Sequence, residues 1–372
     1  MFEKLDIPQE LIPSDPRFGS GPSLVPVEFI RRLLETDVNL LGTSHRASAV
    51  KDLVAEVQSG ISTYFKLPSD YTVVLGNGGA TFLFDMIAIG LVKNCIVHNT
   101  CGEFSNKWYK SSANVPWIKA VENTVDYGLP VVPVNLEGEA DCVAITLNET
   151  STGVQSTALP KLGEDQLLLV DATSGAGQIP MDVSKTDVFF FSPQKVFASE
   201  GGLFVAIMSP RAVERARELA KDKSHYRPVI MDWNLAIDNS VKHQTYNTPS
   251  ISTLFFLNEQ VKLMNELGSD QVFSTANKKA ELVYSWAKEK DYLSSFVGAE
   301  EGRSLTVATI DVDDKYPVEN LIKNLAKEKV VNGIGAYRKL GRNQFRISLF
   351  HNISFEDLEK LTKLISHLIE TV

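Results

Sequence analysis

Residues 166–177 read QLLLVDATSGAG, and residues 187–202 read DVFFFSPQKVFASEGG. Each stretch begins as a short apolar run that ends in turn residues, which is the pattern of a buried β-strand. In open α/β sheets, ligands bind just beyond the carboxyl ends of the strands. The pattern therefore places two charged side chains, Asp171 and Lys195, at the edge of a sheet where a ligand binds.

An acid and a lysine at this edge are the two groups that pyridoxal phosphate (PLP) requires. The lysine forms a Schiff base, and the acid keeps the pyridine nitrogen protonated so that the ring can accept electrons. Taken singly, an aspartate after a strand often binds Mg²⁺ or a ribose, and a lysine after a turn is usually solvated. Lys195, however, lies between two apolar strands, Val188–Phe191 and Leu203–Met208, which is an unfavourable place for a charged side chain that has no function.

The composition is that of a globular chain with room for one large or two ordinary domains: 372 residues, 44% hydrophobic and 22% charged. The formal net charge of −9 argues against nucleic acid as a partner. No run of about 18 apolar residues is present, so neither a membrane-spanning segment nor a membrane partner is expected. An anionic substrate would need a locally basic site within this acidic protein.

Cysteine and histidine usage favours a cytoplasmic location without a metal. The three cysteines, Cys95, Cys101 and Cys142, form no CxxC pair and are too few for a disulfide framework. The six histidines are scattered without metal-ligand spacing, so no metal site is expected. The N-terminus shows neither the apolar run of a signal peptide nor the composition of a transit peptide.

The order of the predicted elements indicates an α/β fold with a large and a small domain. Residues 1–16 are Pro-rich and extended. Strand and helix patterns then alternate to about residue 210, which predicts a mostly parallel, mixed sheet within a large domain at residues 17–255. Residues 256–372 form the predicted small α+β domain, with strands at 305–312 and 344–349.

Apolar periodicity and start signals predict helices at residues 25–34, 47–65, 81–91, 213–220, 250–267, 318–328 and 355–369. Ser354 and Asp357 form the predicted capping box of the last helix.

Three segments offer groups for a ligand. Residues 76–81 read GNGGAT between a strand and a helix, which suits a phosphate but also an ordinary βα turn. Phe104 follows the strand at 95–98 and could face a flat ring, although such a side chain more often belongs to the core. Residues 148–153 follow another strand, where polar groups bind ligands or cap a helix.

Basic candidates come from two segments, residues 44–46 (SHR) and residues 337–346 (YRKLGRNQFR). Arg346 lies inside a strand pattern, and arginine is almost never buried unpaired. Either it meets an internal acid, which is the common case, or it binds an incoming carboxylate or phosphate.

With these residues laid out, the chain resembles the phosphoserine aminotransferases, which are class-V, fold-type-I PLP enzymes. The resemblance runs over nearly the whole length, and in residues 148–153 and 337–344 it is closer to the actinobacterial branch. The matching motifs are FGSGP at 18–22, SHR at 44–46, GGAT at 78–81, NET at 148–150, DATS at 171–174, SPQK at 192–195 and YNTP at 246–249.

The resemblance implies a role for each matching residue. Lys195 would hold PLP and Asp171 would pair with its pyridine nitrogen. Phe104 would stack on the ring, where many relatives have tryptophan, and Thr150 would bond the 3′ oxygen. Further cofactor contacts would come from Ala80, Thr81 and Gln194 and, from the neighbouring subunit of a homodimer with shared active sites, from Asn247 and Thr248. Substrate anions would be bound by His45, Arg46, Arg338 and Arg346, with Arg338 in a segment longer than in the enterobacterial form.

The implied activity is transamination of 3-phosphohydroxypyruvate with L-glutamate, giving O-phospho-L-serine and 2-oxoglutarate for serine biosynthesis. A related phosphorylated keto acid of vitamin B6 synthesis is left open as a second substrate. The nearest alternative is an alanine–glyoxylate or serine–pyruvate aminotransferase, which needs no phosphate site. Cysteine desulfurase is disfavoured because no cysteine lies in an obvious catalytic loop. The last alternative, a non-catalytic PLP-fold binding protein, is disfavoured by the intact Lys195 and Asp171.

Overall fold

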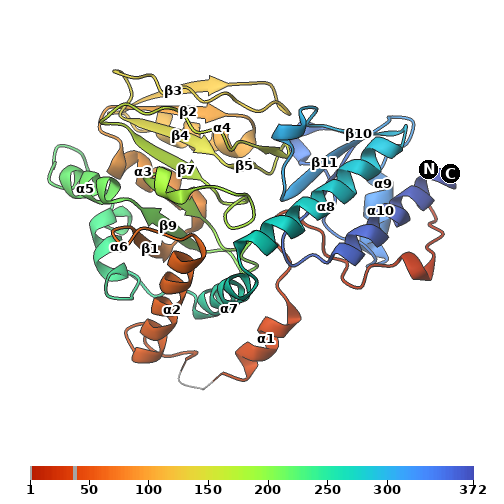
Figure 1. The fold of residues 1–372 in the computed structure, drawn as a ribbon, viewed down its shortest axis with the longest axis horizontal. Coiled ribbons are helices and arrows are strands. Elements are labelled where there is room, and N and C mark those ends of the chain that lie inside the picture. The colour runs from red at the N-terminus through yellow and green to blue at the C-terminus, as the bar shows by residue number, and fades with distance from the viewer. Residues whose placement is uncertain (1, 37–39) are drawn as a thin grey trace.

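The computed structural model describes residues 2–36 and 40–372. Its larger part is built on a mixed sheet with the strand order β1-β9-β8-β7-β4-β2-β3 (Figure 1). The strands of this sheet are β1 (Thr72–Asn77), β2 (Cys95–Thr100), β3 (Lys119–Thr124), β4 (Cys142–Thr146), β7 (Leu167–Asp171), β8 (Val188–Phe191) and β9 (Leu203–Met208).

Strand direction brings the predicted site segments to one edge of this sheet. Strands β2, β3, β4, β7 and β8 pair in parallel, whereas β9 is antiparallel to both β8 and β1. Strand β1 therefore points the same way as β7 and β8, and the turns that follow these strands meet at the carboxyl edge. Asp171 is the last residue of β7, and Lys195 lies in the loop between β8 and β9.

Both faces of the sheet are buried along its central strands, which is why those strands read as continuous apolar runs. Along β8, Phe189 and Phe191 pack into the core shared with α2 and α7, while Val188 and Phe190 pack into the core shared with α3, α5 and α6. The sheet thus lies between two helical layers. The helices of this part are α1 (Val27–Leu34), α2 (Ser48–Tyr64), α3 (Gly79–Leu91), α4 (Glu103–Ala113), α5 (Pro210–Leu219), α6 (Trp233–Ser240) and α7 (Ile251–Leu267).

The remainder of the chain forms a smaller antiparallel sheet, in the order β10-β11-β12, covered by helices (Figure 1). Its elements are β10 (Leu293–Ser295), β11 (Val307–Val312), β12 (Gln344–Ser348), α8 (Ser269–Glu289), α9 (Glu319–Lys327) and α10 (Phe355–Glu370). A short hairpin of β5 (Asn148–Glu149) and β6 (Val154–Gln155) follows β4 in the larger part.

The division into two domains stays a prediction, and side-chain packing indicates where the boundary between them lies. Leu254 and Leu257 of α7 belong to the core of the large sheet, so we propose a boundary at Gly268, between α7 and α8, rather than at residue 256. Phe2 and Phe18 belong to the core of the small sheet, so the N-terminal segment packs with the C-terminal domain. That segment is largely extended, as predicted, apart from a 3₁₀ turn at Gln9–Leu11.

The predicted capping box is only half formed. The Ser354 hydroxyl accepts the backbone N–H of Asp357 at 3.0 Å, as expected. The Asp357 carboxylate, however, accepts the backbone N–H and the hydroxyl of Ser14 at 2.6 and 2.8 Å. The carboxylate therefore ties the N-terminal segment to α10.

Within the described ranges, no helix is long and apolar enough to cross a membrane.

Candidate active site

A cavity of about 220 Å³ opens at the carboxyl edge of the large sheet. It brings together the predicted residues Ala80, Thr81, Phe104, Thr150, Asp171, Gln194 and Lys195. These residues come from five different turns, so chain topology rather than sequence proximity assembles them.

Lys195 projects its amine against the backbone of the N-terminal segment. The Nζ atom donates to the carbonyl oxygen of Ser20 at 2.7 Å. The next residue is Gly21, where a Cβ atom would lie 1.7 Å from Nζ, so a side chain there would displace the lysine. Desolvation, assisted by the positive charge of Arg346, lowers the pKa of Lys195 to about 8. A sizeable fraction of the amine is therefore neutral near pH 8 and able to act as nucleophile or base.

Asp171 is buried at the end of β7 with only 3% of its surface exposed. Burial raises the pKa of this carboxyl to about 6, against the opposing hydrogen bonds from Thr173. The backbone N–H and the hydroxyl of Thr173 both donate to Oδ1, at 2.9 and 2.5 Å. Within the described part of the chain, Oδ2 has no hydrogen-bond partner. This oxygen is therefore available to a donor entering the cavity.

The turn before α3 forms an anion cradle. Gly78 and Gly79 adopt φ angles of +123° and +71°, which favour glycine. They lead into the N-terminus of α3, whose first backbone N–H groups have no partner inside the helix. One of them, that of Ala80, donates to the hydroxyl of Ser192 at 2.6 Å. The side-chain oxygen of Gln194 is buried without a partner beside this turn.

Arg346 reaches the site from the small sheet. It lies on β12, and its Nη1 atom donates to the carbonyl oxygen of Thr150 at 3.4 Å. Its guanidinium lies over the ring of Tyr337, 5.6 Å from the centroid. Burial lowers the pKa of Arg346, and its Nε atom is buried without a partner. No acidic side chain pairs with it in the described residues, so its charge is free to meet an anion.

The structure places four predicted residues in a second cluster, outside the cavity lining. The Thr248 hydroxyl lies 3.0 Å from Nδ1 of His45, and Nη1 of Arg46 donates to Oε1 of Gln244 at 2.9 Å. Asn247 and Thr248 are exposed, and their carbonyl oxygens accept the amide of Asn77, at the end of β1. None of the four lines the chain's own cavity.

Arg338 lies in an exposed 3₁₀ turn, Arg338–Leu340, beside the cavity. The turn is held against α4 at two points. Lys339 pairs with Glu103 at 2.7 Å, and the rings of Tyr337 and Phe104 meet edge to face at 5.8 Å. Arg338 itself has no ion-pair partner within the described ranges.

Sequence reasoning did not assign roles to several residues that the site uses. Ser192 and Thr173 lie within the motifs that carry Lys195 and Asp171, and their hydroxyls hold α3 and Asp171. Proximity to those motifs was the available signal. Ser20 contributes its carbonyl oxygen, which no side-chain pattern reveals.

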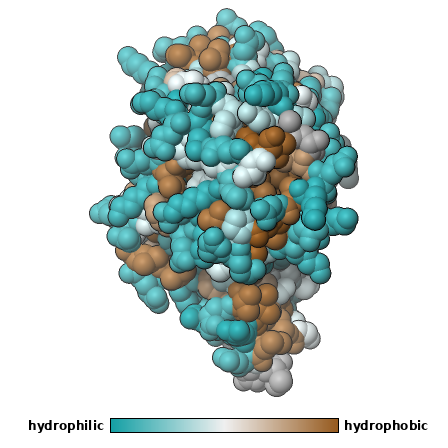
Figure 2. Space-filling model, turned by 90° about the vertical axis from the view of Figure 1, so that its right-hand side faces the viewer, coloured by the Kyte–Doolittle hydropathy of each residue, from teal (hydrophilic) through white to brown (hydrophobic). Residues whose placement is uncertain are grey.

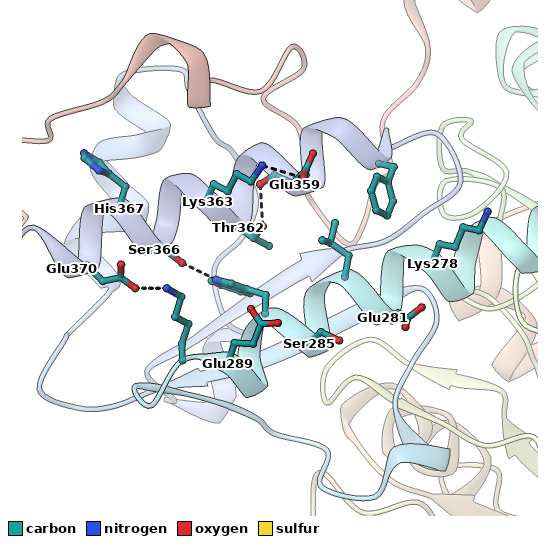
Figure 3. A pocket seen from close by; sticks show the side chains of 14 residues that line it. Lys278, Glu281, Ser285, Glu289, Glu359, Thr362, Lys363, Ser366, His367 and Glu370 are labelled. Carbon is teal, nitrogen blue, oxygen red and sulfur yellow. Dashed lines mark hydrogen bonds and ion pairs between the residues drawn. The ribbon is translucent and has the colours of Figure 1, made fainter.

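A larger cavity, about 700 Å³, lies between α8 and α10. Figure 3 shows two ion pairs beside it: Lys363 pairs with Glu359 at 3.0 Å, and Lys290 pairs with Glu370 at 2.6 Å. Trp286 donates to the hydroxyl of Ser366 across the floor at 2.8 Å. This cavity holds none of the predicted site residues, and these four charges are paired with one another.

The family model for class-V aminotransferases matches residues 18–361 of the chain. The chain belongs to the class-V aminotransferase family. Among its curated relatives, a phosphoserine aminotransferase from Nocardioides is 41% identical over 375 residues and covers 100% of both chains. Another from Rhodococcus opacus is 42% identical over 366 residues, covering 98% of this chain and 97% of the relative.

Solved structures agree on the fold. A phosphoserine aminotransferase from Cytophaga hutchinsonii superimposes with a TM-score of 0.84 at 25% identity, covering 95% of this chain and 99% of the other. An alanine–glyoxylate aminotransferase from Nostoc gives 0.79 at 20% identity, covering 99% and 97%, which shows the shared fold alone. The predicted fold class, family and aminotransferase activity with PLP are confirmed.

The residues of the cavity fit this cofactor. When bound, PLP supplies an aldehyde that condenses with amines and a ring that takes up electrons from the substrate. Lys195 would supply a partly neutral amine for the covalent link and, once released, would move a proton at the substrate's Cα. Oδ2 of Asp171 would accept a ring N–H, and the first turn of α3 would offer backbone N–H groups to a phosphate.

Proposed function

We propose that this enzyme transfers the amino group of L-glutamate to 3-phosphohydroxypyruvate, giving 2-oxoglutarate and O-phospho-L-serine, in serine biosynthesis. Relatives at 41% and 42% identity over the whole chain carry the name of this activity. The vitamin B6 substrate stays open. A cytoplasmic location stays a prediction, and the three unpaired cysteines are consistent with it.

The observation that carries the proposal is the unneutralised charge of Arg346. A half-buried guanidinium with an unpartnered Nε beside Lys195 is costly unless a ligand anion completes it. Every amino acid and keto acid of the proposed reaction brings an α-carboxylate. We assign that carboxylate to Arg346, because the arginine fork binds it with two parallel hydrogen bonds.

A phosphorylated substrate brings a second anion, which needs further basic residues. His45 and Arg46 supply one group, and the exposed Arg338, whose neighbour Tyr337 contacts Phe104, supplies another. The same groups would take the γ-carboxylate of glutamate in the other half-reaction. An enzyme for alanine and glyoxylate needs no such second anion site, so these residues separate the two functions.

We further propose that the enzyme is a homodimer whose subunits share their active sites. Asn247, Thr248, His45 and Arg46 lie together but outside their own cavity, which is expected if they complete the site of a second copy.

Exposed apolar side chains accompany them on the surface, including Ile230 at 45%, Tyr246 at 37% and Val241 at 64%. Figure 2 shows more apolar side chains at the lower end of the molecule, where α1 lies in Figure 1, and Leu34 of α1 is 82% exposed. Exposure on this scale favours an interface.

Replacing Arg46 by alanine tests the second anion site. We expect kcat/KM for phosphohydroxypyruvate and for glutamate to fall by about 10- to 100-fold, since a charge-assisted contact contributes roughly 1.5–3 kcal/mol. The slow reaction with alanine should be unchanged. Arg217→Ala on α5, which removes an exposed arginine paired with Asp238, is the control and should leave all rates unchanged. An equal loss for alanine, which has no distal anion, would refute the assignment.

Mixing two inactive variants tests the shared site. Lys195→Ala removes the amine, and Thr248→Asp sets a carboxylate against the cofactor phosphate, so each homodimer should be nearly inactive. After subunit exchange at equal amounts, one site of each heterodimer is intact, and activity should return to about a quarter of wild type. Verified exchange without recovery would show that each subunit completes its own site.

A further inference from the structure

Glu149, at the end of β5, is a buried acid that the transamination chemistry does not use. Its exposed fraction is 0%. Its carboxylate accepts the backbone N–H of Phe104 at 3.1 Å and that of Ser105 at 2.9 Å. It also accepts the hydroxyls of Ser105 and Ser151 at 2.9 and 2.7 Å. No basic side chain pairs with it in the part of the chain that the structure describes.

These contacts place the carboxylate on the N-terminus of α4, which spans 11 residues. The N-cap residue, Gly102, packs directly on the acid: a Cβ atom there would lie 2.3 Å from Cγ and 2.6 Å from Cδ of Glu149. A glycine at this position is therefore required by the close approach of the acid. The negative charge also suits the positive end of the helix dipole.

The acid joins two walls of the cofactor cavity. One wall is the first turn of α4, where Phe104 faces the cavity and its N–H is held by Glu149. The other wall is the next residue in the chain, Thr150, which also lines the cavity and whose carbonyl accepts Arg346. Ser151 reinforces the joint, since its hydroxyl also accepts the backbone N–H of Glu103 at 3.0 Å.

We propose that Glu149 is a positioning residue that fixes the first turn of α4, so that Phe104 stands against the face of the bound PLP ring. The inference rests on the stacking role of Phe104. A carboxylate suits this place better than an amide, because every group that faces it is a donor. Glutamine would turn its NH₂ group toward a backbone N–H or a hydroxyl.

The test measures the dissociation constant of PLP from the protein, together with the visible circular dichroism of the bound cofactor, which reports its fixed orientation. We expect Glu149→Gln to raise the dissociation constant about tenfold, the scale of one lost aromatic stacking contact, and to diminish the dichroism. Ser151→Ala removes one donor and is the milder variant if Glu149→Gln folds poorly. It should shift both readouts in the same direction by a smaller factor.

Asp357→Asn is the matched control. Asp357 is also buried, 4% exposed, and its carboxylate likewise accepts a backbone N–H and a hydroxyl, both from Ser14, in the small domain. This variant should lower the melting temperature of the protein and leave the dissociation constant of PLP unchanged. A shift in the control equal to that in Glu149→Gln would mean that general destabilisation explains the result and would overturn the proposal.

A double-mutant cycle with Phe104→Ala separates positioning from an independent effect. If Glu149 acts through Phe104, the dissociation constant of the double variant equals that of Phe104→Ala alone. If the effects of the two substitutions on the dissociation constant of PLP multiply, the proposal is wrong. It is also wrong if that constant is unchanged in both Glu149→Gln and Ser151→Ala. An unchanged constant in Phe104→Ala would overturn the stacking role of Phe104 and the proposal with it. Preference among keto acids is measured separately on the wild type, so failure of the phosphoserine assignment leaves these constants untouched.

Discussion

Replacing Lys195 by alanine should lower the transamination rate by about 10²–10⁴-fold, the range that a positioned general base contributes. No other described side chain places an amine in the cavity beside Asp171. Because the same amine makes the covalent link, borohydride treatment of the wild type should fix PLP to Lys195. Peptide mapping that finds the adduct on another lysine would refute this assignment.

Lys279→Met is the control for this variant. Lys279 is 2% exposed, and its Nζ atom donates to the carbonyl oxygens of Phe350 and His351 at 3.1 and 2.7 Å. Burial lowers the pKa of Lys279 to about 7, so it is also a buried lysine with a perturbed pKa. It lies outside the cavity, however, and its loss should lower stability while leaving the activity of the folded protein unchanged.

Replacing Arg346 by alanine should lower kcat/KM for every amino acid and keto acid by about 10²-fold or more. Truncating one partner of a buried, hydrogen-bonded charge pair costs about 2–5 kcal/mol, and all substrates share the α-carboxylate that we assign to this residue. The loss should therefore be general, unlike that of Arg46→Ala, which is confined to substrates with a distal anion.

Arg342→Ala is the control from the same segment. Arg342 pairs with Asp311 at 2.6 Å and stacks on Phe296, so its charge is already neutralised inside the small domain. Steady-state kinetics with glutamate and with alanine should show little change for Arg342→Ala. If Arg346→Ala spares alanine but impairs glutamate, Arg346 binds the distal group and the division of the basic residues is the reverse of the one proposed.

Apolar runs predicted the central strands of the large sheet well, because both faces of the sheet are buried there. The runs at β7, β8 and β9 could be placed almost to the residue. The antiparallel direction of β9 could not, since strand direction depends on the connection and not on the run. Helix α8, whose sequence mixes Lys279 and other polar groups with apolar ones, is not among the predicted elements, and the predicted domain boundary at residues 255/256 falls within α7.

For the site, the sequence indicated which residues bear chemistry but not how they group. Asp171 and Lys195 could be predicted because each follows the carboxyl end of an apolar strand, and both line the cavity. The separation of Arg46 and Thr248 from that cavity depends on tertiary packing that no local pattern carries. The sequence predicts no role for Glu149 outside its motif, because a sequence does not distinguish a buried acid from a solvated one.

The most direct test of the proposed function compares the wild-type kcat/KM for 3-phosphohydroxypyruvate with the values for pyruvate and glyoxylate, with L-glutamate as the amino donor. We predict a preference of about 10²-fold or more for the phosphorylated keto acid, since several charge-assisted contacts at roughly 1.5–3 kcal/mol each depend on the phosphate. Equal use of pyruvate or glyoxylate would contradict it and would favour an alanine–glyoxylate type of aminotransferase.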